Sequence, residues 1–120
     1  MRPYFLFLDD ERYPHYVTWI NLPLGHWFIA RDLEEFKRTI NIKGMPELVS
    51  FDHDLAEEHY KHATADYIPY DEYKIPTGWH CAKWLVEECK RLDEPIPLYA
   101  IHTLNKTGKI NIEKILNADD

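Results

Sequence analysis

The sequence predicts an α/β fold with a parallel sheet of about four strands. Short apolar segments alternate along the chain with segments of helical periodicity, and the apolar segments are continuous rather than alternating with polar residues. Continuous hydrophobicity is typical of strands that are covered on both faces, as in parallel sheets. Joined by right-handed crossovers, such an alternation gives a three-layer sandwich with helices on both faces of the sheet.

Length and composition favour one domain spanning residues 1–120. The 120 residues, 45% of them hydrophobic, suffice for one core and are too few for two ordinary domains. Aromatic residues make up 14% of the chain, which argues against disorder.

The first strand is predicted over residues 4–8, a run that is entirely apolar and stops at Asp9-Asp10-Glu11. Residues 12–23 are rich in aromatic residues and prolines, and a short helix is expected around residues 16–20. Residues 26–30 predict the second strand.

A helix follows the second strand. Asp32 is a candidate N-cap, and Glu35 three residues later completes a pattern like the capping box. Apolar residues then recur at helical spacing, and a glycine and a proline end the helix: Leu33, Phe36, Ile40, Gly44 and Pro46.

The third strand, predicted over residues 47–51, again ends in acidic residues, Asp52-His53-Asp54. Residues 55–76 then form a long polar loop, and loops of this length are often lids or binding loops. Thr77 is expected to cap a helix over residues 78–92.

The fourth strand is predicted over residues 97–101 and ends at His102-Thr103. Residues 105–108 are typical of a turn, and apolar residues at 112, 115 and 116 predict a short final helix.

Charge and cysteine content limit the partners and the compartment. With 14 Lys and Arg against 21 Asp and Glu, the formal charge is −7, which disfavours extended binding along a nucleic-acid backbone. No apolar run approaches the ~20 residues of a membrane helix, and the first four residues lack the cleavage site of a secretory signal. Cys81 and Cys89 would lie about 12 Å apart along a helix, too far for a disulfide, so buried thiols and a cytoplasmic protein are expected.

Three predicted strands end in polar reactive side chains, which a parallel sheet would bring to one edge. Either acidic motif alone could be a turn with solvated side chains. Together, closely spaced carboxylates need a cation or protons between them. Oxygen ligands of this kind suit Mg²⁺ or Mn²⁺.

The motifs at these strand ends resemble one narrow family of receiver domains. Leu8-Asp9-Asp10-Glu11-Arg12, Ser50-Phe51-Asp52-His53-Asp54-Leu55, Thr77-Gly78 and Ile101-His102-Thr103-Leu104-Asn105 with Gly108 are similar to the cyclic-phosphate processing receiver domain family, over about residues 4–116. The resemblance implies a flavodoxin-like receiver fold, a divalent cation, and a role with cyclic phosphates at RNA ends or on nucleotides.

The resemblance also implies roles for individual residues. Asp9 and Asp10 match the acidic metal-binding pair, Asp52 matches the phosphoacceptor position, and Thr103, or His102 beside it, matches the hydroxyl residue that contacts a phosphoryl group. An ordinary receiver has a fifth strand with a phosphate-binding lysine, for which this chain has no clear counterpart. Arg12, Lys106 or Lys109 could replace that lysine.

The expected activity is metal-dependent hydrolysis of a cyclic phosphate ester, on an RNA end or a nucleotide. Asp9, Asp10 and Asp52 would hold the metal, and His102 or His53 could be the general acid. Asp54 would be a further ligand or a base, whereas Asp52 could instead attack phosphorus. Thr103, Asn105 and Arg12 are candidate phosphate ligands.

Two other functions stay open at this point: a non-enzymatic module that binds a nucleotide or a protein, and a phosphorylatable response regulator. Other features also have two interpretations. His53 could be a buried structural residue, Asn105 could simply begin a turn, and the loop tyrosines could stack on a base or pack on the domain. His59 and His62 are expected to be solvated.

Overall fold

The computed structural model describes residues 3–62 and 64–118. Its sheet has four strands, β1 (Phe5–Leu8), β2 (Trp27–Ala30), β3 (Leu48–Phe51) and β4 (Leu98–Ile101). All three pairings are parallel, in the order β2-β1-β3-β4. The predicted parallel α/β fold of receiver type is therefore confirmed.

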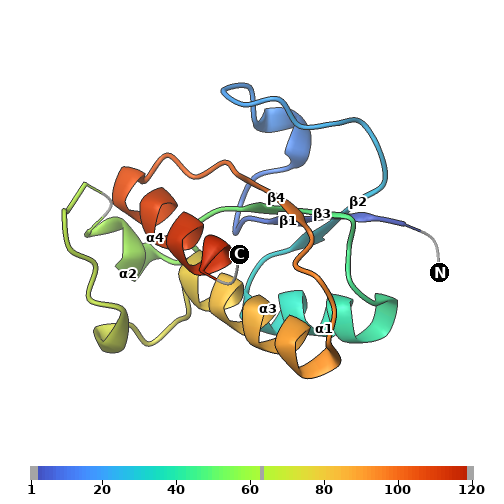
Figure 1. The fold of residues 1–120 in the computed structure, drawn as a ribbon. Coiled ribbons are helices and arrows are strands. Elements are labelled where there is room, and N and C mark those ends of the chain that lie inside the picture. The colour runs from blue at the N-terminus through green and yellow to red at the C-terminus, as the bar shows by residue number, and fades with distance from the viewer. Residues whose placement is uncertain (1–2, 63, 119–120) are drawn as a thin grey trace.

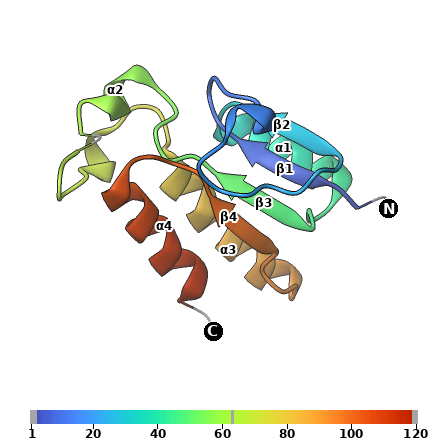
Figure 2. The same cartoon turned by 90° about the horizontal axis from the view of Figure 1, so that it is seen from above.

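The long helices are α1 (Leu33–Lys43), α3 (Gly78–Leu92) and α4 (Lys106–Asn117). Helices α1 and α3 lie on one side of the sheet, and α4 packs beside α3 next to β4 (Figures 1 and 2). The segment between β1 and β2 passes over the opposite side and contains the 3-10 turn η1 (Pro14–Tyr16), close to where a short helix was expected. This segment supplies the third layer, so the expectation of helices on both faces is wrong: the opposite face is covered by an extended connection with only a 3-10 turn.

The alternation of side chains along the strands decides what lies on each side. Leu6, Leu8, Val49 and Phe51 belong to the core beneath the sheet, together with the apolar faces of the helices. Phe7 points the other way, and its ring stacks on that of His102 with centroids 4.5 Å apart.

The helix ends follow the sequence signals. The Asp32 carboxylate accepts a hydrogen bond from the Glu35 N–H at 2.9 Å, and the Thr77 hydroxyl accepts one from the Trp79 N–H at 3.1 Å. Cys81 and Cys89 are both buried free thiols on the inner face of α3, as expected.

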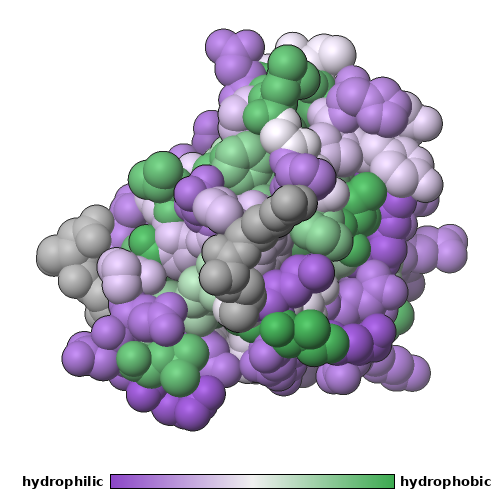
Figure 3. All heavy atoms as spheres, turned by 90° about the vertical axis from the view of Figure 1, so that its right-hand side faces the viewer, coloured by the Kyte–Doolittle hydropathy of each residue, from purple (hydrophilic) through white to green (hydrophobic). Residues whose placement is uncertain are grey.

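The end of the sheet at which β1 begins carries a surface of mixed polarity. In Figure 3, hydrophobic side chains are scattered there among hydrophilic ones. Within residues 3–62 and 64–118, no helix is long and apolar enough to cross a bilayer.

The long connection over residues 55–76 has structure of its own, with helix α2 (Glu57–Tyr60) and the 3-10 turn η2 (Tyr70–Glu72). The expectation that His59 is solvated is wrong, because its side chain is fully buried. Its Nδ1 accepts hydrogen bonds from the N–H groups of Leu55 and Ala56, at 2.9 and 3.1 Å. Its Nε2–H donates to the Ile75 carbonyl at 2.7 Å. His59 thus joins the start of the loop to its end.

Replacing His59 with alanine is expected to destabilise the protein by about 1–3 kcal/mol, because it leaves buried backbone groups unpaired. Burial lowers the pKa of His59, so the folded protein keeps it neutral. As the pH falls below about 6.5, His59 is protonated in the unfolded chain before it is protonated in the folded protein. The stability that neutral His59 contributes is therefore lost below this pH.

Thermal unfolding of the parent protein and the His59→Ala variant between pH 5 and 8 checks this prediction. His15→Ala, which removes an exposed histidine, is the control. Equal acid sensitivity of the His59→Ala variant and the parent would contradict it.

Candidate functional site

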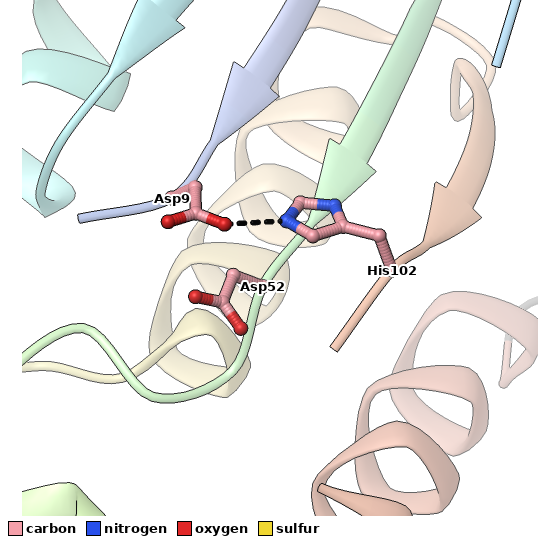
Figure 4. Close-up of side chains that lie close together, drawn as sticks. All are labelled: Asp9, Asp52 and His102. Atoms are coloured by element: carbon pink, nitrogen blue, oxygen red, sulfur yellow. Dashed lines mark hydrogen bonds and ion pairs between the residues drawn. The ribbon is translucent and has the colours of Figure 1, made fainter. Parts of the chain in front are cut away.

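Three buried polar side chains meet at the carboxyl ends of β1, β3 and β4: Asp9, Asp52 and His102 (Figure 4). One possible ligand atom of each lies within 4.8 Å of the others. Each residue follows its strand in the register that points away from the helices, the register shared by Phe7 and Ser50. The parallel sheet thus gathers the three groups on the side covered by the segment between β1 and β2.

Asp9 and His102 form the closest pair, with His102 Nε2 3.0 Å from Asp9 Oδ2. Burial favours the protonated form of Asp9, but hydrogen bonds from His102 and from the N–H groups of Arg12 and Glu11 outweigh it and lower the pKa of Asp9 to about 2. The carboxylate is therefore ionised at neutral pH.

The other ring nitrogen of His102, Nδ1, lies 2.7 Å from the Ser50 hydroxyl. Burial lowers the pKa of His102, against the opposing influence of the Asp9 carboxylate. In a neutral ring, Nε2–H donates to Asp9 and Nδ1 accepts from Ser50. Ser50 is a polar residue in a buried strand, and this bond gives it a partner.

The pKa of Asp52 is shifted in the opposite direction to that of Asp9. Burial and then the charge of Asp9 raise the pKa of Asp52 to about 8, although the His53 N–H and Arg12 favour its ionised form. Arg12 Nη1 is 3.3 Å from Asp9 Oδ2 and 4.0 Å from Asp52 Oδ2. Without a further cation, Asp52 therefore keeps its proton at neutral pH while Asp9 is ionised.

Arg12 is held in place from two sides. Its guanidinium lies 5.3 Å from the ring centre of Trp19, whose indole N–H donates to the His102 carbonyl at 2.7 Å. Arg31 donates to the backbone carbonyls of Asp9 and Arg12, at 3.1 and 2.7 Å, and thereby fixes the turn after β1.

Asp10 lies outside the group formed by Asp9, Asp52 and His102. It is half-buried, and its Oδ1 is 3.5 Å from the Tyr60 hydroxyl. Burial and the neighbouring carboxylates raise its pKa. Of the three metal ligands predicted from the sequence, the structure brings two together, and His102 occupies the third place.

A cavity of about 260 Å³ opens beside Asp52. Its lining includes the predicted phosphate ligands Arg12, Thr103 and Asn105, together with Asp54. His102 and His53 are fully buried and do not line it. Lys106 and Lys109, which could have replaced the receiver lysine, are exposed on α4 and do not line it either.

Asp54 is oriented toward this cavity by two neighbours. His53 Nδ1 lies 2.6 Å from Asp54 Oδ1, and Asn105 Nδ2 is 3.2 and 3.4 Å from its two oxygens. Asn105 also caps α4, because its Oδ1 accepts from the Gly108 N–H at 2.9 Å. Both roles considered for Asn105 are thus possible at once.

His53 contacts Asp54 but does not line the cavity. Its Nε2 is 2.9 Å from the Tyr70 hydroxyl, and a Cβ at Gly108 would come within 2.5 Å of its Cγ. A side chain at position 108 would therefore displace the imidazole. No local pattern in the sequence indicates Tyr70 as the partner of His53, since the two are 17 residues apart.

The sheet order, the acidic strand ends and the adjacent cavity define the class of protein: a receiver-like α/β domain. The family model of the cyclic-phosphate processing receiver domain matches residues 4–118, nearly the whole chain. The chain belongs to that family. Comparisons with curated proteins and with solved structures gave no match.

Proposed function

We propose that this domain binds Mg²⁺ or Mn²⁺ through Asp9, Asp52 and His102 and hydrolyses a cyclic phosphate ester in the adjoining cavity. The observation that carries the proposal is the convergence of the three possible ligand atoms beside a cavity lined by Arg12 and Thr103. The family description ties the domain to cyclic phosphates. The substrate is expected to be a nucleotide or an RNA end with a cyclic phosphate.

The residues fit a divalent cation. Two carboxylates and an imidazole are a suitable donor set, and the imidazole favours Mn²⁺ over Mg²⁺. Burial and the charge of Asp9 raise the pKa of Asp52, and the single Arg12 guanidinium only partly offsets them. A divalent cation in this position would neutralise charge on a phosphate and lower the pKa of a bound water.

The chain's own residues would divide the remaining work. Arg12 can pair with a phosphate oxygen, and the Thr103 hydroxyl can donate to another. Asp54 faces the cavity with its carboxylate fixed by His53 and Asn105, so it is better placed than His102 to transfer a proton to or from the substrate. In the metal-free protein His102 hydrogen-bonds to both Asp9 and Ser50. For His102 to hold the cation through Nε2, its remaining proton would sit on Nδ1 and donate to the Ser50 hydroxyl.

A screen of 2′,3′-cyclic, 3′,5′-cyclic and terminal phosphates with Mg²⁺, Mn²⁺ or EDTA, followed by mass spectrometry, tests the proposal. We expect a metal-dependent product from a cyclic phosphate. The Asp9→Asn variant should lose Mn²⁺ binding in calorimetric titrations and lose turnover at least 100-fold. Asp93→Asn, at the far end of α3, is the matched control.

Three results would redirect the assignment. Binding of a nucleotide without any product would favour a non-enzymatic module. Phosphate on Asp52 after treatment with a small phosphodonor would favour a response regulator. Turnover that persists in EDTA would contradict the metal requirement.

A further inference from the structure

We propose that a second cavity, lined by aromatic side chains, binds a nucleobase. It has a volume of about 590 Å³ and lies between the second half of the long connection, the start of α3 and the outer side of α4. Its aromatic lining consists of Tyr67, Tyr70 and Trp79. It shares no lining residue with the 260 Å³ cavity beside Asp52, called the acidic cavity below, and is ample for a purine ring.

The aromatic lining of this cavity consists of a stacked pair of rings and one exposed tyrosine. Tyr70 and Trp79 are stacked, with ring centroids 4.4 Å apart and planes 13° apart. Tyr67 stands at the edge, 76% exposed, and has no ring contact within the described part of the chain. An exposed tyrosine beside a rigid aromatic pair is a surface on which a planar base can stack.

Polar groups around the rings match the edges of a base. Asp66 and Asp71 can accept hydrogen bonds from the N–H groups of a base, and Lys114 can donate to its carbonyl or ring nitrogens. All three side chains are exposed to water, so a hydrocarbon ligand would gain no hydrogen bond from them. A nucleobase uses both kinds of group, and a purine offers the larger stacking area.

The aromatic cavity is physically linked to the acidic cavity. The Tyr70 hydroxyl is 3.0 Å from Asn111 Nδ2 and 2.9 Å from His53 Nε2, and His53 Nδ1 is 2.6 Å from Asp54. A single imidazole therefore separates the wall of one cavity from a carboxylate of the other.

The polypeptide itself also runs between the two cavities. Thr64 lines the acidic cavity and Asp66 the aromatic one, and the Thr107 hydroxyl fixes the intervening Ala65 carbonyl to α4 at 2.8 Å. Figure 2 places this connection at one end of the molecule, next to the start of α4. That the base belongs to the molecule whose phosphate enters the acidic cavity rests on the proposed function.

Titration with nucleosides in the presence of EDTA tests base binding separately from that function, because neither phosphate nor cation takes part. The readout is the NMR signal of the Trp79 indole N–H. We expect saturable shifts with guanosine and adenosine and weaker ones with uridine and cytidine. Tyr67→Ala should weaken purine binding about tenfold. Tyr16→Ala, which removes an exposed tyrosine on η1, should leave it unchanged.

Two outcomes would overturn the proposed base site, and a third would separate it from the proposed function. The absence of any Trp79 shift up to about 10 mM purine nucleoside would overturn it. Equal binding by Tyr67→Ala and the parent would also overturn it, since stacking on that ring is its central claim. Nucleoside binding without turnover of any cyclic phosphate would keep this site and remove the proposed function instead.

Discussion

Asp52→Asn is expected to abolish divalent-cation binding and turnover while making the metal-free protein more stable. The pKa of Asp52 is raised to about 8 by burial and by Asp9, so the folded protein holds a proton there that the unfolded chain releases near pH 4. The free energy of unfolding therefore falls as the pH rises from about 4 to about 8. Asparagine does not ionise, and the advantage of the variant should grow across this range to about 3 kcal/mol or more.

Urea unfolding in EDTA at pH 5, 7 and 9, with Mn²⁺ titrations of the same samples, measures both effects. Glu87→Gln is the control here, because it makes the same change from carboxylate to amide at an exposed position of α3 that does not line the cavity. A variant that is less stable than the parent at pH 9 would contradict the prediction. Retention of Mn²⁺ binding would remove Asp52 from the ligand set.

Gly78→Ala is expected to damage the site through the backbone. Gly78 is the first residue of α3, and a Cβ there would lie 1.7 Å from the backbone carbonyl oxygen of Asp52. Its N–H donates to the His53 carbonyl at 2.8 Å, so the turn after β3 and the start of α3 are in direct contact. The added methyl group must push the two apart, at a cost of about 1–3 kcal/mol or more in stability and with displacement of Asp52.

Thermal unfolding and Mn²⁺ titration of the folded variant measure this damage. Lys83→Ala, on the exposed side of the same helix, should change neither quantity appreciably. An unchanged melting temperature for Gly78→Ala would mean that the turn after β3 yields more easily than its contacts suggest.

The sheet, its helices and the location of the acidic residues could be predicted from the sequence, because each follows from a local pattern. Continuous apolar runs marked the four strands, and the parallel arrangement then placed Asp9, Asp52 and His102 at one edge. The alternation of side chains could also have indicated that Asp10, one residue past Asp9, points elsewhere. Motif resemblance favoured the Asp9-Asp10 pair instead.

What could not be predicted depends on contacts between distant parts of the chain. His59 looked solvated in a polar loop, yet the backbone groups it satisfies lie at both ends of that loop. The partnership of His53 with Tyr70, and the cavity that Tyr70 lines, depend on how the connection folds back on α4. No local periodicity in the sequence indicates that these distant segments come into contact.

The position of Trp19 makes the site suited to optical study. Its indole N–H donates to the carbonyl of His102, and its ring lies against the guanidinium of Arg12. Trp19 therefore contacts both a residue of the proposed metal site and the arginine beside it. Its emission should respond when charge is added nearby, and a paramagnetic ion such as Mn²⁺ should quench it strongly. The protein thus carries an intrinsic fluorophore with which titrations can be followed without a label.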